Sequence, residues 1–265
     1  MFETNPTVSV VIPTFNRSDL LPQAIDSVLA QTYPAEIIVV DHGSRDRTPE
    51  VVQNYGDKIR YLRRDEDFGP HFCWLDGVLH STGEFVHLQF DDDLLSPSFI
   101  EKTVSLFDDD VGFTFSLADV FDHETEKTLS TQFSDWVPRT AVYQNEVIEK
   151  KILQGLISPA AAVYRKQVLL DALYQGRLPL GDNYYHGVGP DCFVTLLSML
   201  RYPKVGVVTE SLAQFRSHKD SITVDAYANE EKTKRIAAAY NDVKVFYKDL
   251  KRIKWLRQHL PFLLK

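Results

Sequence analysis

The sequence predicts an α/β fold in which a mostly parallel sheet is flanked by helices and followed by a C-terminal helical extension. In the first half, short apolar runs alternate with segments of helical spacing, as expected of right-handed βαβ units. The run at 36–41 (EIIVVD) is continuously apolar, which is typical of a strand buried on both faces. From about 227 to 260, apolar residues recur three or four positions apart, which indicates a long amphipathic helix.

Prolines help to define the bounds of the predicted elements in the first half. Pro13 closes the first apolar run, and Pro49 is acceptable in the first turn of a helix. The predicted strands span 7–13, 36–41, 59–64 and 83–90, and the predicted helices span 18–31, 44–55 and 68–80.

The second half is less regular. We predict a strand pair at 111–121 and 127–133, helices over 145–155 and 190–201, and two strands within 203–218. Because the sequence has no internal repeat and no Gly/Ser linker, we predict one domain over 1–222, in two halves that meet near residue 110, and an extension over 223–265.

Composition excludes some functions. The net charge is −8, from 29 basic and 37 acidic residues, so nucleic acid is not an expected partner. Cys73 and Cys192 are far apart and outside any CxxC motif, which predicts buried thiols in a reducing compartment. The N-terminal apolar run is too short for a signal peptide and no run is long enough to span a membrane, so we expect a cytoplasmic protein.

Polar residues follow three of the predicted strands, at 13–17 (PTFNR), 41–46 (DHGSRD) and 91–93 (DDD). Parallel strands end at one edge of a sheet, and ligands of such sheets bind beyond that edge, so one crevice is expected to collect all three segments. Adjacent carboxylates repel each other and therefore suggest a bound cation. The alternative is a solvated acidic turn that caps the following helix.

Four blocks in order, VSVVIPTFNR, AIDSVLAQTYP, EIIVVDHGSRDRT and STGEFVHLQFDDDLLSP, resemble the family 2 glycosyltransferases, which are inverting enzymes of GT-A fold. GVGPDCFVTLL and FRSHKDSIT look like two further landmarks of the family. The resemblance implies sugar transfer from a nucleotide-diphosphate sugar, with Mg²⁺ or Mn²⁺, to a glycan or lipid-linked acceptor. Family frequency favours UDP over GDP or dTDP. Residues 1–222 would then be the GT-A catalytic domain, with a nucleotide-sugar half (1–110) and an acceptor half (111–222).

The acidic triplet resembles the DxD element of this family. The resemblance implies Asp91 and Asp93 as metal ligands, Asp91 or Asp92 as a ribose or metal-water contact, and His218 as a further metal ligand. The chemistry is consistent, because Mg²⁺ and Mn²⁺ prefer oxygen ligands and a divalent cation neutralises a leaving diphosphate.

Residues of the first two loops match the nucleotide site of the family. The resemblance implies nucleotide contacts for Pro13, Thr14, Asn16, Arg17, Asp41, Gly43 and Ser44. The alternatives are that Asp41 is a turn or N-cap carboxylate, that Asn16 or Ser18 caps the first helix, and that Arg17 is solvated.

Inverting transfer needs a general base for the acceptor hydroxyl. Asp191 occupies the position of the catalytic carboxylate of the family, with Asp182 as the fallback and a helix-entry carboxylate as the alternative. Candidate acceptor contacts, or else core residues, are Trp136, Tyr184, Tyr185 and His186. Arg216 or Lys219 could meet the diphosphate, and 217–225 could form a lid.

The extension is basic in an otherwise acidic chain, with seven Lys and Arg between 244 and 265 against Asp249. Such a helix either lies on the inner face of an anionic membrane as a peripheral anchor or packs on the domain or on a second copy in a homodimer. Two other functions stay open: a sugar-nucleotidyltransferase, although 13–18 lacks the glycine-rich phosphate loop, and a degenerate glycan-binding or scaffold protein of the same fold.

Overall fold

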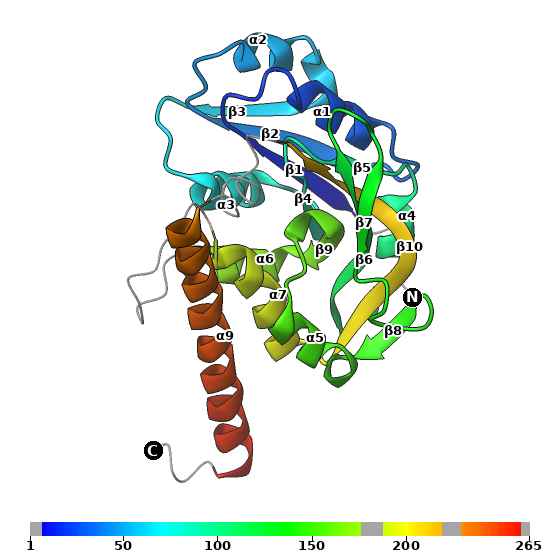
Figure 1. The fold of residues 1–265 in the computed structure, drawn as a ribbon, viewed down its shortest axis with the longest axis vertical. Helices are drawn as coiled ribbons and strands as arrows, with labels where there is room; N and C mark the ends of the chain where they lie inside the picture. The colour runs from blue at the N-terminus through cyan, green and yellow to red at the C-terminus, as the bar shows by residue number, and fades with distance from the viewer. Residues whose placement is uncertain (1–6, 176–187, 219–228, 261–265) are drawn as a thin grey trace.

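A computed structural model describes residues 7–175, 188–218 and 229–260 (Figure 1). Its central feature is one mixed sheet with the strand order β3-β2-β1-β4-β9-β6-β10-β5, to which β7 is added beside β6 and β8 beside β10. The strands are β1 (Val8–Thr14), β2 (Glu36–His42), β3 (Arg60–Arg64), β4 (Phe85–Leu88), β5 (Leu94–Leu95), β6 (Val111–Asp122), β7 (Thr128–Gln132), β8 (Ala141–Gln144), β9 (Ala162–Arg165) and β10 (Lys204–Ser217).

The direction of the strands decides where a site can form. β1 pairs in parallel with β2 and β4, β2 with β3, and β6 with β10. The exception inside the sheet is β9, which is antiparallel to both β4 and β6. β4 and β6 therefore run in the same direction, and β1, β2, β4, β6 and β10 all end at one edge of the sheet.

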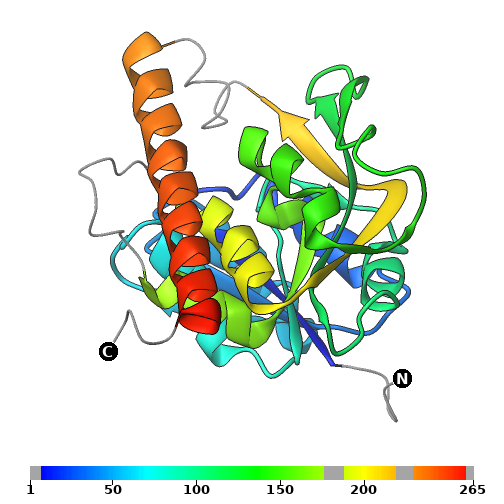
Figure 2. The ribbon, with the colours of Figure 1, turned by 90° about the horizontal axis from the view of Figure 1, so that it is seen from below.

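Helices cover both faces of this sheet. They are α1 (Leu21–Leu29), α2 (Thr48–Gln53), α3 (Pro70–His80), α4 (Phe99–Val104), α5 (Glu149–Gln154), α6 (Lys166–Gln175), α7 (Pro190–Arg201) and α9 (Glu230–His259), with short 3-10 turns at Gly56–Lys58, Asn145–Val147 and Pro159–Ala161. Helices α3, α6 and α7 pack side by side, and α9 lies outside α7 (Figures 1 and 2). On the opposite side of β1–β3 lie α1 and α2 (Figure 1).

The predicted fold class is confirmed, with corrections in the second half. Segment 203–218 is one long strand, β10, instead of two, because register shifts near Val208 and Ser211 bend it without ending it. The predicted helix over 145–155 is a 3-10 turn followed by α5, since the Ile148 N–H donates three residues back, to the Asn145 carbonyl oxygen (3.1 Å), and α-helical bonding starts only after it. Strands β8 and β9 and helix α6 were not predicted.

The C-terminal helix α9 packs on the domain through its middle part. Ala239, Val243 and Tyr247 are buried, whereas Ile253 and Trp255 in the second half are exposed. Figure 1 shows this second half extending away from the sheet. Within the described ranges, no helix combines the length and apolar character needed to cross a bilayer. Cys73 and Cys192 are buried free thiols, as predicted.

Candidate active site

The three polar segments predicted to converge do so at the carboxyl edge of the sheet. β1 lies between β2 and β4, with all three parallel. Pro13 pairs with Val40 and Thr14 with Asp41 at the end of the β1–β2 ladder. Thr14 is buried and Pro13 is half-buried. The loop that follows β1 therefore starts directly beside the loop that follows β2.

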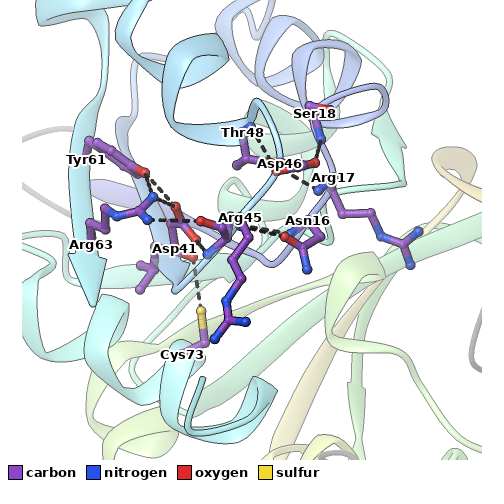
Figure 3. Close-up of polar contacts among 12 residues, drawn as sticks. Asn16, Arg17, Ser18, Asp41, Arg45, Asp46, Thr48, Tyr61, Arg63 and Cys73 are labelled. Atoms are coloured by element: carbon purple, nitrogen blue, oxygen red, sulfur yellow. Dashed lines mark hydrogen bonds and ion pairs between the residues drawn. The ribbon is translucent and has the colours of Figure 1, made fainter. Parts of the chain in front are cut away.

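These two loops are tied together by reciprocal hydrogen bonds (Figure 3). The Asn16 N–H donates to Ser44 Oγ (2.9 Å) and the Arg45 N–H donates to Asn16 Oδ1 (2.8 Å). Asn16 has a φ of 53°, a left-handed conformation that asparagine tolerates better than most residues. The Arg17 N–H donates to Thr48 Oγ1 (3.1 Å). Asn16 is thus a bridge between loops.

Helix α1 receives no side-chain cap from either predicted candidate. Its N-cap position is Leu20, without a capping side chain. The Ser18 N–H instead donates to Asp46 Oδ2 (3.0 Å), so the alternative in which Asn16 or Ser18 caps α1 is wrong. The segment 16–18 instead fixes the loops at the carboxyl edge of the sheet, which is called the rim below. Arg17 extends from this segment toward the acidic residues Asp91–Asp93.

Asp41 is fully buried, and both of its carboxylate oxygens are bonded within the protein (Figure 3). Oδ1 accepts the Ser44 N–H (2.8 Å), as the predicted turn carboxylate would. Oδ2 accepts Tyr61 OH (2.6 Å) and Arg63 Nη1 (2.8 Å). Burial and Asp41 together raise the pKa of Tyr61 to about 12. A nucleobase that contacts Asp41 must therefore share it with Tyr61 and Arg63.

Sequence reasoning missed Tyr61 and Arg63. The available signal was their spacing, because residues two apart on a strand share one face and β3 adjoins β2. Gly43, which follows β2, has a φ of +83°, and a Cβ there would stand 3.0 Å from the Asp65 carbonyl oxygen. The loops after β2 and β3 therefore approach each other too closely at Gly43 for a side chain to fit without a shift of the backbone.

The family that the segment at 41–46 resembles usually has the motif DDGS where this chain has DHGS, so His42 replaces a second carboxylate, and its side chain lies away from that of Asp41. Consecutive residues of a strand point to opposite faces, and His42 Nε2 stands 3.7 Å from Asp76 Oδ2 on α3. Burial lowers the pKa of His42 despite the carboxylate of Asp76. The departure from the motif thus changes the packing under α3 and leaves the Asp41 side of β2 unaltered.

The acidic cluster, Asp91 to Asp93, follows β4 at the same edge. Asp91 Oδ1 lies 3.9 Å from Arg17 Nε, and Asp92 Oδ2 lies 3.0 Å from His218 Nε2. Asp93, only 7% exposed, accepts the Arg216 N–H at Oδ1 (2.9 Å). Burial and the charge of Asp92 raise the pKa of Asp91 to about 7, and the same causes raise the pKa of Asp93 well above its usual range. The donors around the cluster thus fall short of neutralising its charge.

Arg216 is an anchor of this cluster instead of a free phosphate ligand. Its guanidinium donates to the Asp92 carbonyl oxygen (2.8 Å) and to Gln23 Oε1 (2.7 Å). It also meets His123 Nδ1 at 3.0 Å and lies over the Phe121 ring at 4.8 Å. These contacts use three of the five N–H donors of the guanidinium, and they fix its orientation, so the hypothesis that Arg216 meets a diphosphate stays a prediction. Lys219 and most of the predicted lid lie outside the described residues.

A divalent cation fits the acidic cluster. Its carboxylates lie close together, half-buried or buried, and repel one another, so a cation would relieve the charge that raises the pKa values of Asp91 and Asp93. Across the described ranges, no three His, Cys, Asp or Glu side chains are already arranged as a metal-ligand set. The predicted ligands Asp91, Asp93 and His218 are therefore near one another without forming a complete set. One or two carboxylates suffice where phosphate oxygens and waters complete the coordination.

Asp191 lies at the start of α7. This helix ends at Arg201, and β10 begins at Lys204 at the opposite edge, so the start of α7 is directed toward the carboxyl edge (Figure 1). Asp191 Oδ1 accepts the Gly189 and Cys192 N–H groups (both 2.8 Å), and Oδ2 accepts Tyr240 OH (2.8 Å). Burial raises the pKa of Asp191 to about 6. The helix-entry alternative is thus part of its role.

The remaining candidates divide between core and undescribed segments. Trp136 is half-buried and packs its ring against Phe115 and Phe133 at centroid distances of 6.0 and 5.1 Å, as the core alternative predicts. Asp182, Tyr184, Tyr185 and His186 lie outside the described residues.

The protein thus has a mixed α/β fold in which the loops after β1 and β2 and the acidic cluster Asp91–Asp93 meet at the carboxyl edge of the sheet. Asp191 is a second, separate acidic position. Among protein families, the model of Glycosyl transferase family 2 matches residues 9–171. The chain therefore belongs to glycosyl transferase family 2, and the resemblance of its sequence blocks to that family is confirmed.

Individual proteins agree with this assignment. An uncharacterized glycosyltransferase of Rickettsia typhi is 40% identical over 103 residues, which are 38% of this chain and 32% of that protein. GalNAc(5)-diNAcBac-PP-undecaprenol beta-1,3-glucosyltransferase of Campylobacter jejuni is 32% identical over 170 residues, 62% of this chain and 53% of that protein. The chain thus spans only part of each of these relatives.

Solved structures share the fold. The crystal structure of Staphylococcus aureus TarS residues 1–349 in complex with UDP-GlcNAc superposes with a TM-score of 0.64 at 19% identity, covering 88% of this chain and 66% of that one. The same TarS segment in complex with UDP gives a TM-score of 0.62, covering 88% and 65%. At this identity the likeness establishes the GT-A fold alone.

Proposed function

We propose that the chain is an inverting glycosyltransferase that moves a sugar from a nucleotide-diphosphate sugar, with UDP favoured, to a hydroxyl of a glycan or lipid-linked saccharide. The observation that carries the proposal is a pair of separate acidic positions whose pKa values are raised by burial: Asp91 and Asp93 of the cluster, and the lone Asp191. Perturbed carboxylates of this kind are typical of functional sites. The names of the Campylobacter relative and of the TarS complexes support a lipid-linked acceptor and a UDP-sugar donor.

In this mechanism Asp191 is the general base. The acceptor oxygen attacks the anomeric carbon while its proton passes to Asp191. The bond from that carbon to the diphosphate breaks on the opposite face, and its electron pair leaves with the diphosphate. The configuration therefore inverts. With a pKa of about 6, Asp191 is ionised at pH 7 and still basic enough to accept the proton.

The rim of the sheet binds the donor in this proposal. Asp41 and the loops that contain Pro13 to Arg17 and Gly43 to Ser44 contact the nucleoside, and Asp91 or Asp92 contacts the ribose. Asp91 and Asp93, with His218 as a proposed third contact, would hold Mg²⁺ or Mn²⁺. Such an ion supplies neutralisation of the leaving diphosphate when it is bound.

The decisive experiment compares Asp191→Asn with wild type in a sugar-transfer assay over a panel of nucleotide-sugars with Mn²⁺. We expect transfer to fall by about 10²–10⁴-fold, the usual contribution of a positioned base, while donor binding in a thermal-shift assay is retained. Asp108→Asn is the matched control, because Asp108 is exposed and pairs with Lys204 (3.6 Å). Near-normal transfer by Asp191→Asn would rule out Asp191 as the base.

The same panel separates the alternative functions. A degenerate glycan-binding or scaffold protein would bind a donor or glycan and turn over nothing, even by slow hydrolysis. A sugar-nucleotidyltransferase would make the nucleotide-sugar from a nucleoside triphosphate and release pyrophosphate. The loop at 13–18 contains no glycine, which disfavours a glycine-rich phosphate loop there.

We also propose peripheral contact between the second half of α9 and the inner face of an anionic membrane. Trp255 and Ile253 are exposed among Lys248, Arg252 and Arg257, and basic helices with such residues bind acidic lipid surfaces. Co-sedimentation with vesicles that contain phosphatidylserine should be lost at high salt and in an Arg252→Glu/Trp255→Ala variant. A concentration-dependent dimer without lipid binding would instead assign this face to a second copy.

A further inference from the structure

The first half of α9 is attached to the start of α7, where Asp191 lies. Val243 and Ala239 of α9 are each 3% exposed. A Cβ built on Gly189, the residue at the N-cap of α7, would lie 3.3 Å from Val243 Cγ2 and 3.8 Å from the Ala239 carbonyl oxygen. The helix therefore presses directly on the turn that positions Asp191.

Polar contacts along one face of α9 hold it in that position. Lys244 Nζ donates to the Gly155 carbonyl oxygen (2.9 Å), and Tyr247 OH donates to Glu149 Oε1 (2.7 Å). Lys251 also pairs with Glu149 (2.6 Å). These residues and Tyr240 are three or four positions apart, so they share the face of α9 that meets the domain. The position of Tyr240 is therefore set by contacts along the middle of the helix, from Ala239 to Lys251.

The hydrogen bonds to Asp191 divide by oxygen. Oδ1 is occupied by two main-chain N–H groups at the start of α7, whereas Oδ2 accepts Tyr240 OH at 2.8 Å. A carboxylate oxygen can accept about two hydrogen bonds, so Oδ2 keeps capacity for an acceptor hydroxyl. Tyr240 then determines which oxygen of Asp191 faces that hydroxyl, and in which direction.

We propose that Tyr240 of the C-terminal helix is a positioning residue for the general base, through its hydrogen bond to Asp191 Oδ2, and that the first half of α9 is thereby part of the active site. The inference rests on the proposed role of Asp191. Under this inference the predicted extension over 223–265 supplies a side chain to the site.

The electrostatics of Asp191 make this role measurable. Burial raises its pKa to about 6, and the Tyr240 hydroxyl is the foremost of the hydrogen bonds that oppose the rise. Among the described residues, the other titratable or charged groups that interact at this position are Cys192 on α7, Tyr164 on β9 and Lys244 on α9. Burial raises the pKa of Cys192 to about 12 and also raises that of Tyr164. These two groups therefore do not titrate near pH 6, where Asp191 does.

The test is the pH dependence of kcat/KM in Tyr240→Phe, which removes the hydroxyl and keeps the ring. The base must be deprotonated, so the rate falls as the pH drops through the pKa of Asp191. Without the hydroxyl, the midpoint of this acid limb should move upward by about one unit, the equivalent of one hydrogen bond to a charged group. At pH 7 this shift alone lowers the rate about twofold, and the loss of orientation of the base lowers it further, so the total fall should be about three- to tenfold.

Tyr247→Phe is the matched control, because it removes a hydroxyl from the same helix face that bonds Glu149 instead of Asp191. We expect its acid limb to stay at the wild-type position. If Tyr240→Phe also keeps the wild-type limb, or only loses stability as Tyr247→Phe does, the inference is overturned.

A second measurement applies if Tyr240→Phe is too slow for its pH dependence of kcat/KM to be measured. The Tyr240 hydrogen bond stabilises the charged form of Asp191, so the Tm difference between wild type and Tyr240→Phe should widen as the pH rises through about 6. A constant difference from pH 5 to pH 7.5 would contradict the proposal. The two proposals can be contradicted separately. If Asp191→Asn is active, Asp191 is not the base. If Asp191→Asn is inactive but Tyr240→Phe keeps the acid limb of wild type, only the proposed role of Tyr240 is wrong.

Discussion

Replacement of Arg216 by alanine should destabilise the acidic cluster more than any other single cation removal that we describe. Arg216 is only 8% exposed, and its guanidinium donates to the Asp92 carbonyl oxygen and to Gln23 Oε1. It also lies 4.8 Å from the centroid of the Phe121 ring. Arg216→Ala removes all of these contacts, while the Arg216 main-chain N–H can still donate to Asp93.

The magnitude follows from those contacts. Each hydrogen bond from a charged donor is worth about 1.5–3 kcal/mol, and the cation–π contact about 0.5–1 kcal/mol. Partial replacement by water reduces the sum, and we expect the free energy of unfolding to fall by about 3 kcal/mol. For a chain of this size that corresponds to a fall in Tm of about 6–12 °C.

Thermal and urea unfolding of Arg216→Ala, Arg216→Lys and Arg47→Ala measure this effect. Arg47 is the control, because its side chain is 74% exposed and lies 3.8 Å from Asp19, a surface pair worth about 0–1 kcal/mol. Arg216→Lys keeps the charge but cannot donate in two directions from a planar group, so it should fall between the other two. An Arg216→Ala protein within about 1 kcal/mol of wild type would refute the anchoring role.

Two further substitutions test the rim. Asp93→Asn should abolish the stabilisation that a UDP-sugar with Mn²⁺ gives in a thermal-shift assay, and Asp108→Asn should retain it; full metal-dependent stabilisation in Asp93→Asn would remove Asp93 from the ion site. Gly43→Ala should cost about 2–3 kcal/mol in urea unfolding, because its φ is +83° and the new Cβ stands 3.0 Å from the Asp65 oxygen. Gly56→Ala has a φ of +53° but nothing within 4 Å, so it should cost only about 1 kcal/mol, and equal costs would contradict the role of close approach at Gly43.

The elements that position the rim were predictable because their local signals agree. The strand at Glu36–His42 is a continuous apolar run, and β1 ends within a residue of Pro13. Helix α7 was predicted at its observed bounds, Pro190–Arg201, since Pro190 suits a first turn. Parallel neighbours then bring the strand ends together without further information from the sequence.

The strand β9 and the helix α6 were not predictable in the same way. β9 ends at Arg165 and α6 begins at the next residue, Lys166. No Gly, Pro, Asn or Asp marks this boundary in the sequence. The pairing of β9 with β4 and β6 is antiparallel and non-local, and such pairings depend on the tertiary fold. The single strand β10 likewise bends at register shifts that carry no proline.

The partners of the carboxylates distinguish structural from chemical positions better than the carboxylates themselves, and those partners come from distant segments. Asp41 is held by the cation Arg63 and by Tyr61, both from β3, so its charge is balanced inside the fold. Among the described residues, the donors that Asp191 accepts from are neutral and include one from α9, and burial raises its pKa to about 6. A buried carboxylate without a cation gains stability by taking up a proton. That is the property that a base in the proposed sugar transfer requires, and α9 limits its extent, because the Tyr240 hydroxyl opposes the rise in the pKa of Asp191.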